Sequence, residues 1–148
     1  MENFNAPNAN QLLFIQVKVS STYRATTRVY LKIDGNLIKP AVANSDPHEN
    51  GSIDLDENGK FQWSNIGLAN TFKGNQLIFI TTIYDLPSTL SGNDDTKAFI
   101  LNNIEIDYLL DQNSTPEYSA SEYKLNNNDT IVLDIPKTSI VYKKIKIS

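Results

Sequence analysis

The chain has 148 residues, 40% hydrophobic and 20% charged, which fits one globular domain with its own core and excludes a largely disordered chain. It has no cysteine, which excludes disulfide frameworks, thiolate metal centres and cysteine nucleophiles. Its net charge of -4 would repel a polyanion, so we expect no nucleic-acid partner.

The beginning of the chain is polar and rich in asparagine, which predicts a flexible N-terminal arm over residues 1-10 and a folded domain over residues 11-148. From Leu12 onward, apolar residues alternate with polar ones. Leu13, Ile15, Val17 and Val19 then share one face, the pattern of a strand with one wet side.

A hairpin is predicted next, because Val29, Leu31 and Ile33 alternate in the same way and run into Asp34-Gly35, a dipeptide suited to a tight turn. Ile38 and Val42 are expected to return on the buried face. Since Pro40 cannot donate a ladder hydrogen bond, the returning strand should be an edge strand or carry a bulge.

A second hairpin is predicted around the three-residue loop 57–59. This loop would place Leu55 opposite Phe61, Ile53 opposite Trp63 and Asp56 opposite Lys60, so that apolar residues pair with apolar ones and opposite charges pair with each other. The register puts Trp63 on the buried face.

The middle of the chain contains the apolar run 77–80 within residues 76–84, which predicts a central strand buried on both faces and therefore two stacked sheets. Residues 85–97 follow as a long polar loop. Alternation at Ile104, Ile106, Tyr108 and Leu110 predicts a further strand.

Toward the C-terminus, Thr115-Pro116-Glu117 has the form of a helix start and predicts one short helix near 116-125. Residues 131–135 alternate as a strand, and Pro136 separates this strand from a last one that ends at Ile147. In the last strand the apolar parity changes between Tyr142 and Ile145, which predicts a β-bulge at Lys143-Lys144, and the lysines 143, 144 and 146 suggest an edge strand.

Together these elements predict an all-β fold: a single-domain antiparallel β-sandwich, Greek-key or jelly-roll-like, with about eight or nine strands. A sandwich is favoured over a barrel because the predicted strands differ in length.

Two groups of acidic and amide side chains are candidate metal ligands. Asp54, Asp56 and Asn58 match the first half of a calcium loop, but the position of its final bidentate carboxylate is occupied by Asn65. Hairpin pairing explains the same residues without an ion.

The second group, Asp85, Asp94 and Asp95, lies in the predicted long loop. The alternative to a metal site is that these residues are simply polar side chains of a solvated loop. If the domain has a functional loop, this one is the first candidate.

No catalytic centre is recognisable, and we expect no enzymatic activity. His48 is the single histidine, it lies among turn-forming residues, and no nucleophile elbow accompanies it. Glu105 and Asp107 share one strand face, as a pair of working carboxylates would, but solubility explains them as well.

The leading functional hypothesis is a non-enzymatic interaction module, a subunit or adaptor in a larger assembly, with a protein partner or a homo-oligomer. The second is a calcium-assisted domain that binds carbohydrate or an anionic membrane surface through acidic loops; the third is a small carboxylate-dependent hydrolase using Asp94 or Glu105. Carbohydrate binding needs an exposed aromatic ring. No secretory signal or apolar run of about 18 residues is seen, so a cytoplasmic location without a transmembrane segment is expected, leaderless export being the alternative.

Overall fold

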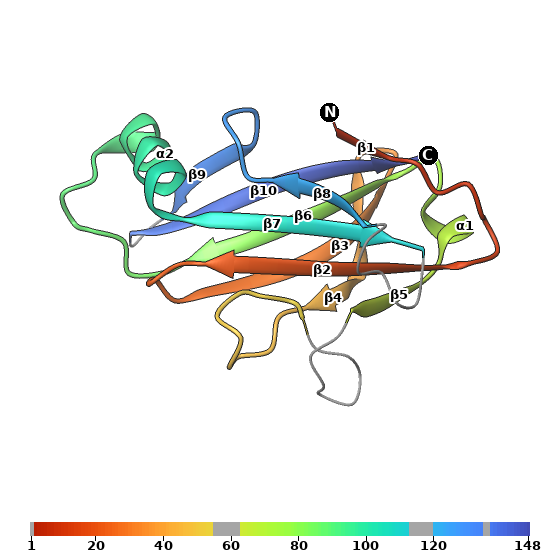
Figure 1. Ribbon diagram of the computed structural model, residues 1–148. Helices are drawn as coiled ribbons and strands as arrows, with labels where there is room; N and C mark the ends of the chain where they lie inside the picture. Colours follow the sequence, from red (N-terminus) through yellow and green to blue (C-terminus); the bar gives the residue numbers. More distant parts are fainter. Residues whose placement is uncertain (1, 55–62, 113–119, 135–136) are drawn as a thin grey trace.

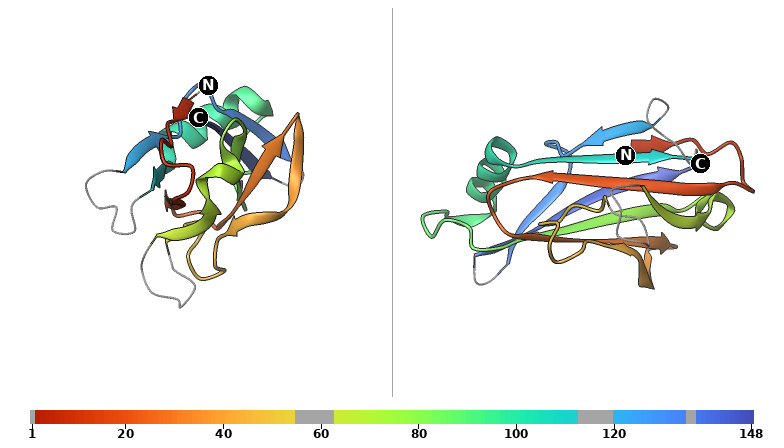
Figure 2. Two further views of the ribbon diagram at one scale, coloured as in Figure 1. Left: turned by 90° about the vertical axis from the view of Figure 1, so that its right-hand side faces the viewer. Right: turned by 60° about the horizontal axis from the view of Figure 1, so that its bottom comes forward.

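A computed structural model describes residues 2–54, 63–112, 120–134 and 137–148. Ten strands form two sheets stacked face to face, which confirms the all-β sandwich (Figure 1, Figure 2). The six-stranded sheet has the order β1-β10-β6-β3-β4, with β9 also paired to β10; the four-stranded sheet has the order β5-β2-β7-β8.

The six-stranded sheet contains β1 (Glu2–Phe4), β3 (Ala25–Ile33), β4 (Asn36–Asn44), β6 (Gln76–Ile83), β9 (Thr130–Asp134) and β10 (Thr138–Ile147). The four-stranded sheet contains β2 (Leu12–Ser20), β5 (Ser64–Leu68), β7 (Glu105–Asp111) and β8 (Ser121–Lys124). Two helices, α1 (Ala69–Phe72) and α2 (Gly92–Asn103), connect the strands.

The core lies between the sheets and is built from alternate residues of each strand, as the period of two predicts. Leu13, Ile15 and Val17 of β2 are fully buried. Phe79 of β6 meets Tyr108 of β7 edge to face, with ring centroids 5.1 Å apart. Because such aromatic contacts favour one geometry, this pair fixes how the central strands of the two sheets face each other.

The first predicted hairpin is confirmed. Strands β3 and β4 are joined by Asp34 and Gly35, both with positive φ (50° and 82°), the combination that a type I′ turn requires. As Pro40 predicts, β4 is an edge strand, and its register shifts between the pairs formed by Ile38 and Ala43. The burial predicted for Ile38 is wrong, since 41% of it is exposed.

The predicted loop over residues 85–97 is wrong in its second half, because helix α2 begins at Gly92. The helix starts after Ser91, whose backbone N–H donates to Asp95 Oδ2 at 2.9 Å. Asp94 and Asp95 lie in the first turn, where carboxylates are stabilised by the positive end of the helix dipole. These acids therefore already have a structural explanation.

The helix predicted near 116-125 is wrong over its last residues, because Ser121–Lys124 form strand β8. Tyr123 pairs with Tyr108 of β7 and is half-buried, so tertiary pairing overrides the local helix-start pattern. Residues 113–119 lie outside the described part of the chain, as do residues 55–62 of the second predicted hairpin. Trp63, predicted to be buried, lies within the described residues and is only partly buried.

No β-bulge occurs in β10, contrary to the sequence prediction. The strand pairs with β6 without a register shift from Ser139 to Lys146, and it is an interior strand, not the predicted edge. The parity is preserved because Lys143 takes an inward position and is completely buried. A lysine ammonium can occupy such a position only with charged partners, and these are described below.

The N-terminal residues form strand β1, which pairs in parallel with the end of β10. Phe4 and Ala6 are buried, and Ser148 N donates to Phe4 O at 2.9 Å, so the two chain ends lie together (Figure 1). Neither helix in the described ranges has the length and apolar character needed to cross a bilayer.

Candidate functional site

The structure does not bring the candidate metal ligands of residues 85–97 into one group. Asp85 lies before α2 and forms a long, exposed ion pair with Arg24 at 3.8 Å, whereas Asp94 and Asp95 belong to the first turn of α2. Within the described ranges, no three histidine, aspartate or glutamate side chains are grouped so as to hold a metal ion.

Of the second candidate group, only Asp54 is described, since Asp56 and Asn58 lie in 55–62. Asp54 is buried, and its hydrogen bond with Glu49 and its negative charge raise the pKa of the Glu49 carboxyl, because they disfavour a second charge beside it. Calcium binding stays a prediction here. A thermal melt in calcium tests it, because an ion bound only by the folded chain raises Tm.

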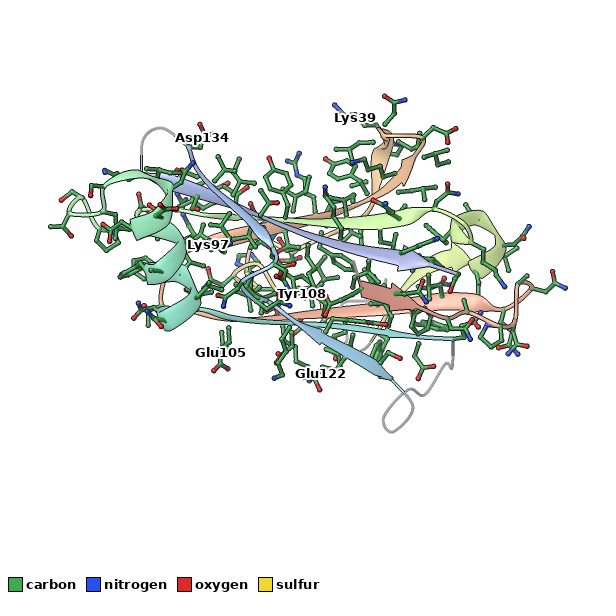
Figure 3. All side chains as sticks on the ribbon, turned by 90° about the horizontal axis from the view of Figure 1, so that it is seen from above. Lys39, Lys97, Glu105, Tyr108, Glu122 and Asp134 are labelled. Atoms are coloured by element: carbon green, nitrogen blue, oxygen red, sulfur yellow. The ribbon has the colours of Figure 1, made fainter. Side chains whose placement is uncertain are left out.

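Glu105 and Asp107 do share the outer face of the four-stranded sheet, as predicted. In Figure 3, Glu105 and Glu122 point away from the sandwich on that side, while Tyr108 points between the sheets. Asp107 is paired with Lys124 of β8 at 3.2 Å, and Lys124 also contacts Glu122 at 3.4 Å. The two carboxylates raise the pKa of Lys124, and the hydrogen bond to Asp107 is the largest cause. Asp107 therefore has a structural role as the partner of Lys124.

The outer face of the six-stranded sheet has a different character. Its outward positions on β3, β6 and β10 carry cations and large apolar or aromatic side chains, and we call this surface the basic face. Its members are Arg28, Tyr30, Lys32, Ile78, Ile80, Ile140, Tyr142, Lys144 and Lys146. Of the residues that the structure describes at outward positions of β3, β4, β6, β9 and β10, one is acidic: Asp134, at the end of β9.

The basic face is organised in rows across the sheet. Lys144 is paired with Ile78 of β6, which is paired with Tyr30 of β3; the next row joins Tyr142, Ile80 and Arg28. In the row on the other side, Gln76 stands between Lys146 and Lys32. An apolar centre on β6 therefore has two cations along β3 and two along β10.

The centre of the basic face is hollowed. A cavity of about 300 Å³ lies over Ile78 and Ile80 and is bordered by Leu37, Tyr142, Lys32 and Lys144, with Gly35 and Thr130 completing the lining. Ile78 is only 3% exposed although it points away from the core, because its neighbours on the face cover it, whereas Leu37 is 40% exposed. The twisted β3–β4 hairpin, with Lys39 on it, stands up beside this surface (Figure 3).

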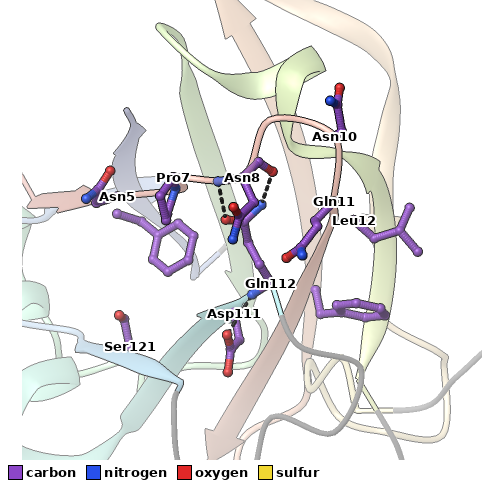
Figure 4. A pocket seen from close by; sticks show the side chains of 11 residues that line it. Asn5, Pro7, Asn8, Asn10, Gln11, Leu12, Asp111, Gln112 and Ser121 are labelled. Carbon is purple, nitrogen blue, oxygen red and sulfur yellow. Dashed lines mark hydrogen bonds between the residues drawn. The ribbon is translucent and has the colours of Figure 1, made fainter.

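A second cavity, of about 780 Å³, lies where the N-terminal segment crosses the end of the four-stranded sheet (Figure 4). Asn8 and Gln112 join its two sides: Asn8 N donates to Gln112 Oε1 at 3.2 Å, and Gln112 Nε2 donates to Asn8 O at 2.7 Å. The lining also includes Asn5, Asn10, Gln11, Asp111 and Ser121 together with Phe4, Pro7, Leu12 and Phe14. Phe14 is half-buried, so part of its ring reaches the cavity.

A charged group inside the sandwich was missed by the sequence prediction. Lys143 Nζ lies 3.1 Å from Asp129 Oδ2, donates to Lys124 O at 2.8 Å and forms an ion pair with Glu2. It also lies 5.7 Å from the centre of the Tyr108 ring. The sequence did contain a signal for this group, because uninterrupted alternation along the last strand places Lys143 on the buried face. The predicted β-bulge would have turned Lys143 away from that face, so the signal was not recognised.

This group closes one side of the sandwich, because its members come from β1, β8 and β10 and from the turn before β9. Tyr123 OH adds a hydrogen bond to Asn3 O at 2.8 Å, linking β8 to β1. Burial raises the pKa of Tyr108 well above its ordinary value, and the nearby Asp129 and Glu2 carboxylates add to the shift. The geometry suits a structural ion-pair network, whose members hold the sheets together.

Comparison of the chain with protein-family models, with curated proteins and with solved structures gives no match.

Proposed function

We propose that this protein is a non-enzymatic interaction module that docks an acidic protein surface on the basic face. The observation that carries this proposal is the distribution of charge. Arg28, Lys32, Lys144 and Lys146 surround apolar and aromatic side chains, although the whole chain carries a net charge of -4.

Two physical arguments support docking there. Aromatic side chains and arginine are enriched in protein interfaces, and an apolar centre with a charged rim is the usual anatomy of such a surface. In addition, stacked sheets lie about 10 Å apart, which is close to the screening length at about 0.1 M salt. An approaching partner therefore responds to the near face more than to the net charge.

The test is affinity purification of the tagged full chain from its source cells, with quantitative mass spectrometry. The variant Lys32→Glu/Lys144→Glu reverses two cations of the basic face. Lys18→Glu/Lys73→Glu is the matched control, because it makes the same change of charge at positions outside that face.

We expect a partner with an acidic surface that the wild type and the control retain and the basic-face variant loses. Equal recovery from all three proteins, or no co-purifying protein with any of them, would overturn the proposal. Circular dichroism and thermal melting establish that the variants are folded.

A second candidate function, carbohydrate binding, is favoured by the cavity beside the N-terminal segment. Sugar recognition combines polar groups that bind hydroxyls with an aromatic ring against which the apolar side of the sugar packs. Asn5, Asn10 and Gln11 supply amides, and the part of Phe14 that reaches the cavity supplies the ring.

Glycan-array binding of the wild type, Phe14→Ala and Gln11→Ala tests this second function. A specific glycan bound by the wild type and lost in both variants would support it. Binding that is absent, or that survives both substitutions, would exclude this cavity as a carbohydrate site.

A further inference from the structure

We infer that the element recognised by the basic face is an extended acidic peptide segment carrying one central apolar or aromatic anchor. This inference rests on the proposed function and specifies the chemistry of the partner. The anchor would occupy the cavity of about 300 Å³ over Ile78 and Ile80.

The cavity accepts one large side chain. Its floor is aliphatic, its walls include the half-buried ring of Tyr142 and the exposed side chain of Leu37, and it is open to solvent on the outer side of the sheet. Burying an anchor there removes apolar surface of both partners from water, which favours binding in proportion to the area buried. A buried anchor in a pocket is where interfaces concentrate their binding energy.

The cations set what must flank the anchor. Arg28 and Lys32 are four residues apart on β3, hence about 13 Å, and β3 and β10 lie two strand spacings apart, hence about 10 Å. In an extended peptide, side chains two residues before and two residues after the anchor lie on the anchor's side and about 13 Å apart. Acids at these two positions therefore match the spacing of the cations.

A peptide fits this arrangement better than a single-headed amphiphile such as a fatty acid. Four cations on two strands, β3 and β10, need several negative charges on one ligand to be engaged together. A single carboxylate could reach one or two of them.

The test uses a blocked peptide with the central sequence Glu-Ser-Phe-Ser-Glu, titrated into the isotopically labelled full chain and followed by NMR chemical shifts. One control peptide has alanine in place of phenylalanine, and another has lysine in place of both glutamates. Lys144→Glu is the test variant and Lys73→Glu the matched control; decanoate is titrated in parallel.

We expect saturable shifts at Ile78, Ile80 and Tyr142, weakened about tenfold by the alanine peptide and about tenfold by Lys144→Glu, and unchanged in Lys73→Glu. The lysine peptide should not bind, and about 1 M salt should abolish binding because the screening length is then about 3 Å.

Three results would overturn the inference: no shifts at about 1 mM peptide, equal binding of the alanine peptide, or decanoate binding the cavity more tightly than the peptide. If a natural partner depends on Lys32 and Lys144 while the peptide fails, this inference is wrong and the proposed function stands. If the peptide binds but no natural partner depends on these lysines, the proposed function is wrong.

Discussion

Replacing Lys143 by methionine is the perturbation whose effect can be worked out most fully from the structure. The ammonium lies between Asp129 and Glu2, and the lysine side chain is 1% exposed. Methionine fills nearly the same space without the charge. Removing one partner of a buried ion pair typically costs about 3–5 kcal/mol, because the remaining charge stays buried.

The lower end of this range applies here. Glu2 is 39% exposed in its side chain and can turn to solvent, so the cost falls on Asp129, which is 10% exposed. Asp129 Oδ2 keeps one donor, the Asn126 backbone N–H at 2.9 Å. We therefore expect Lys143→Met to lower the free energy of unfolding by about 3 kcal/mol.

Urea unfolding followed by circular dichroism measures this loss. With a slope of about 2 kcal/mol per M, the midpoint should fall by about 1.5 M. Adding Asp129→Asn removes the stranded charge while its side-chain oxygen can still accept from Asn126. The double variant should be more stable than Lys143→Met alone. A loss below about 0.5 kcal/mol in Lys143→Met, with no coupling to Asp129, would refute the buried ion pair.

Three further predictions follow from single residues. The pKa of Tyr108 is raised in the folded protein, so the stability that this group contributes is present below its ordinary pKa of about 10 and is lost as pH rises through the raised value. The urea midpoint should therefore fall more steeply above about pH 10 in the wild type than in Tyr108→Phe. Equal slopes in the two proteins would contradict this prediction. The hydrogen bond and the negative charge of Asp54 raise the pKa of the Glu49 carboxyl, so Glu49 should titrate by NMR above the ordinary glutamate pKa of about 4.3, and Asp54→Asn should lower that pKa. Gly35→Ala should lower the free energy of unfolding by about 1 kcal/mol, because Gly35 has a φ of 82°, which an alanine adopts only with strain. A Cβ at this position would have open space, so backbone strain is the whole expected effect. An unchanged urea midpoint would contradict the turn geometry.

Much of the sandwich could be predicted because burial of one face imposes a period of two. Leu13, Ile15 and Val17 are buried as expected, and the run 77–80 forms the middle of the interior strand β6. The hairpin at Asp34-Gly35 was predictable for a local reason, since few residues tolerate two successive positive φ angles.

The errors arise where long-range contacts outweigh local patterns. Strand β8 forms because Tyr123 pairs across from Tyr108, a contact that the nearby Thr115-Pro116 pattern does not reveal. Helix α2 was missed because Asp94 and Asp95 were interpreted as loop oxygens, whereas acids after Ser91 also suit a helix start.

The basic face was only partly visible in the sequence. The lysines near the C-terminus formed a recognisable cluster, but alternation sends Lys143 into the core and Lys144 outward, and that separation depends on the partners of Lys143. Arg28 and Lys32 lie more than 100 residues earlier in the chain. Sheet order brings them to the same surface, and a single sequence does not specify sheet order.

Lysine labelling in a gently prepared lysate of the source cells tests most directly whether the basic face binds a partner. The rates of acetylation at Lys32, Lys144 and Lys146 are compared with those at Lys18 and Lys73, in the lysate and in the purified chain. If the basic face is occupied, the first three lysines react more slowly in the lysate while the other two are unchanged. Equal rates for all five lysines in both samples would contradict a docked partner.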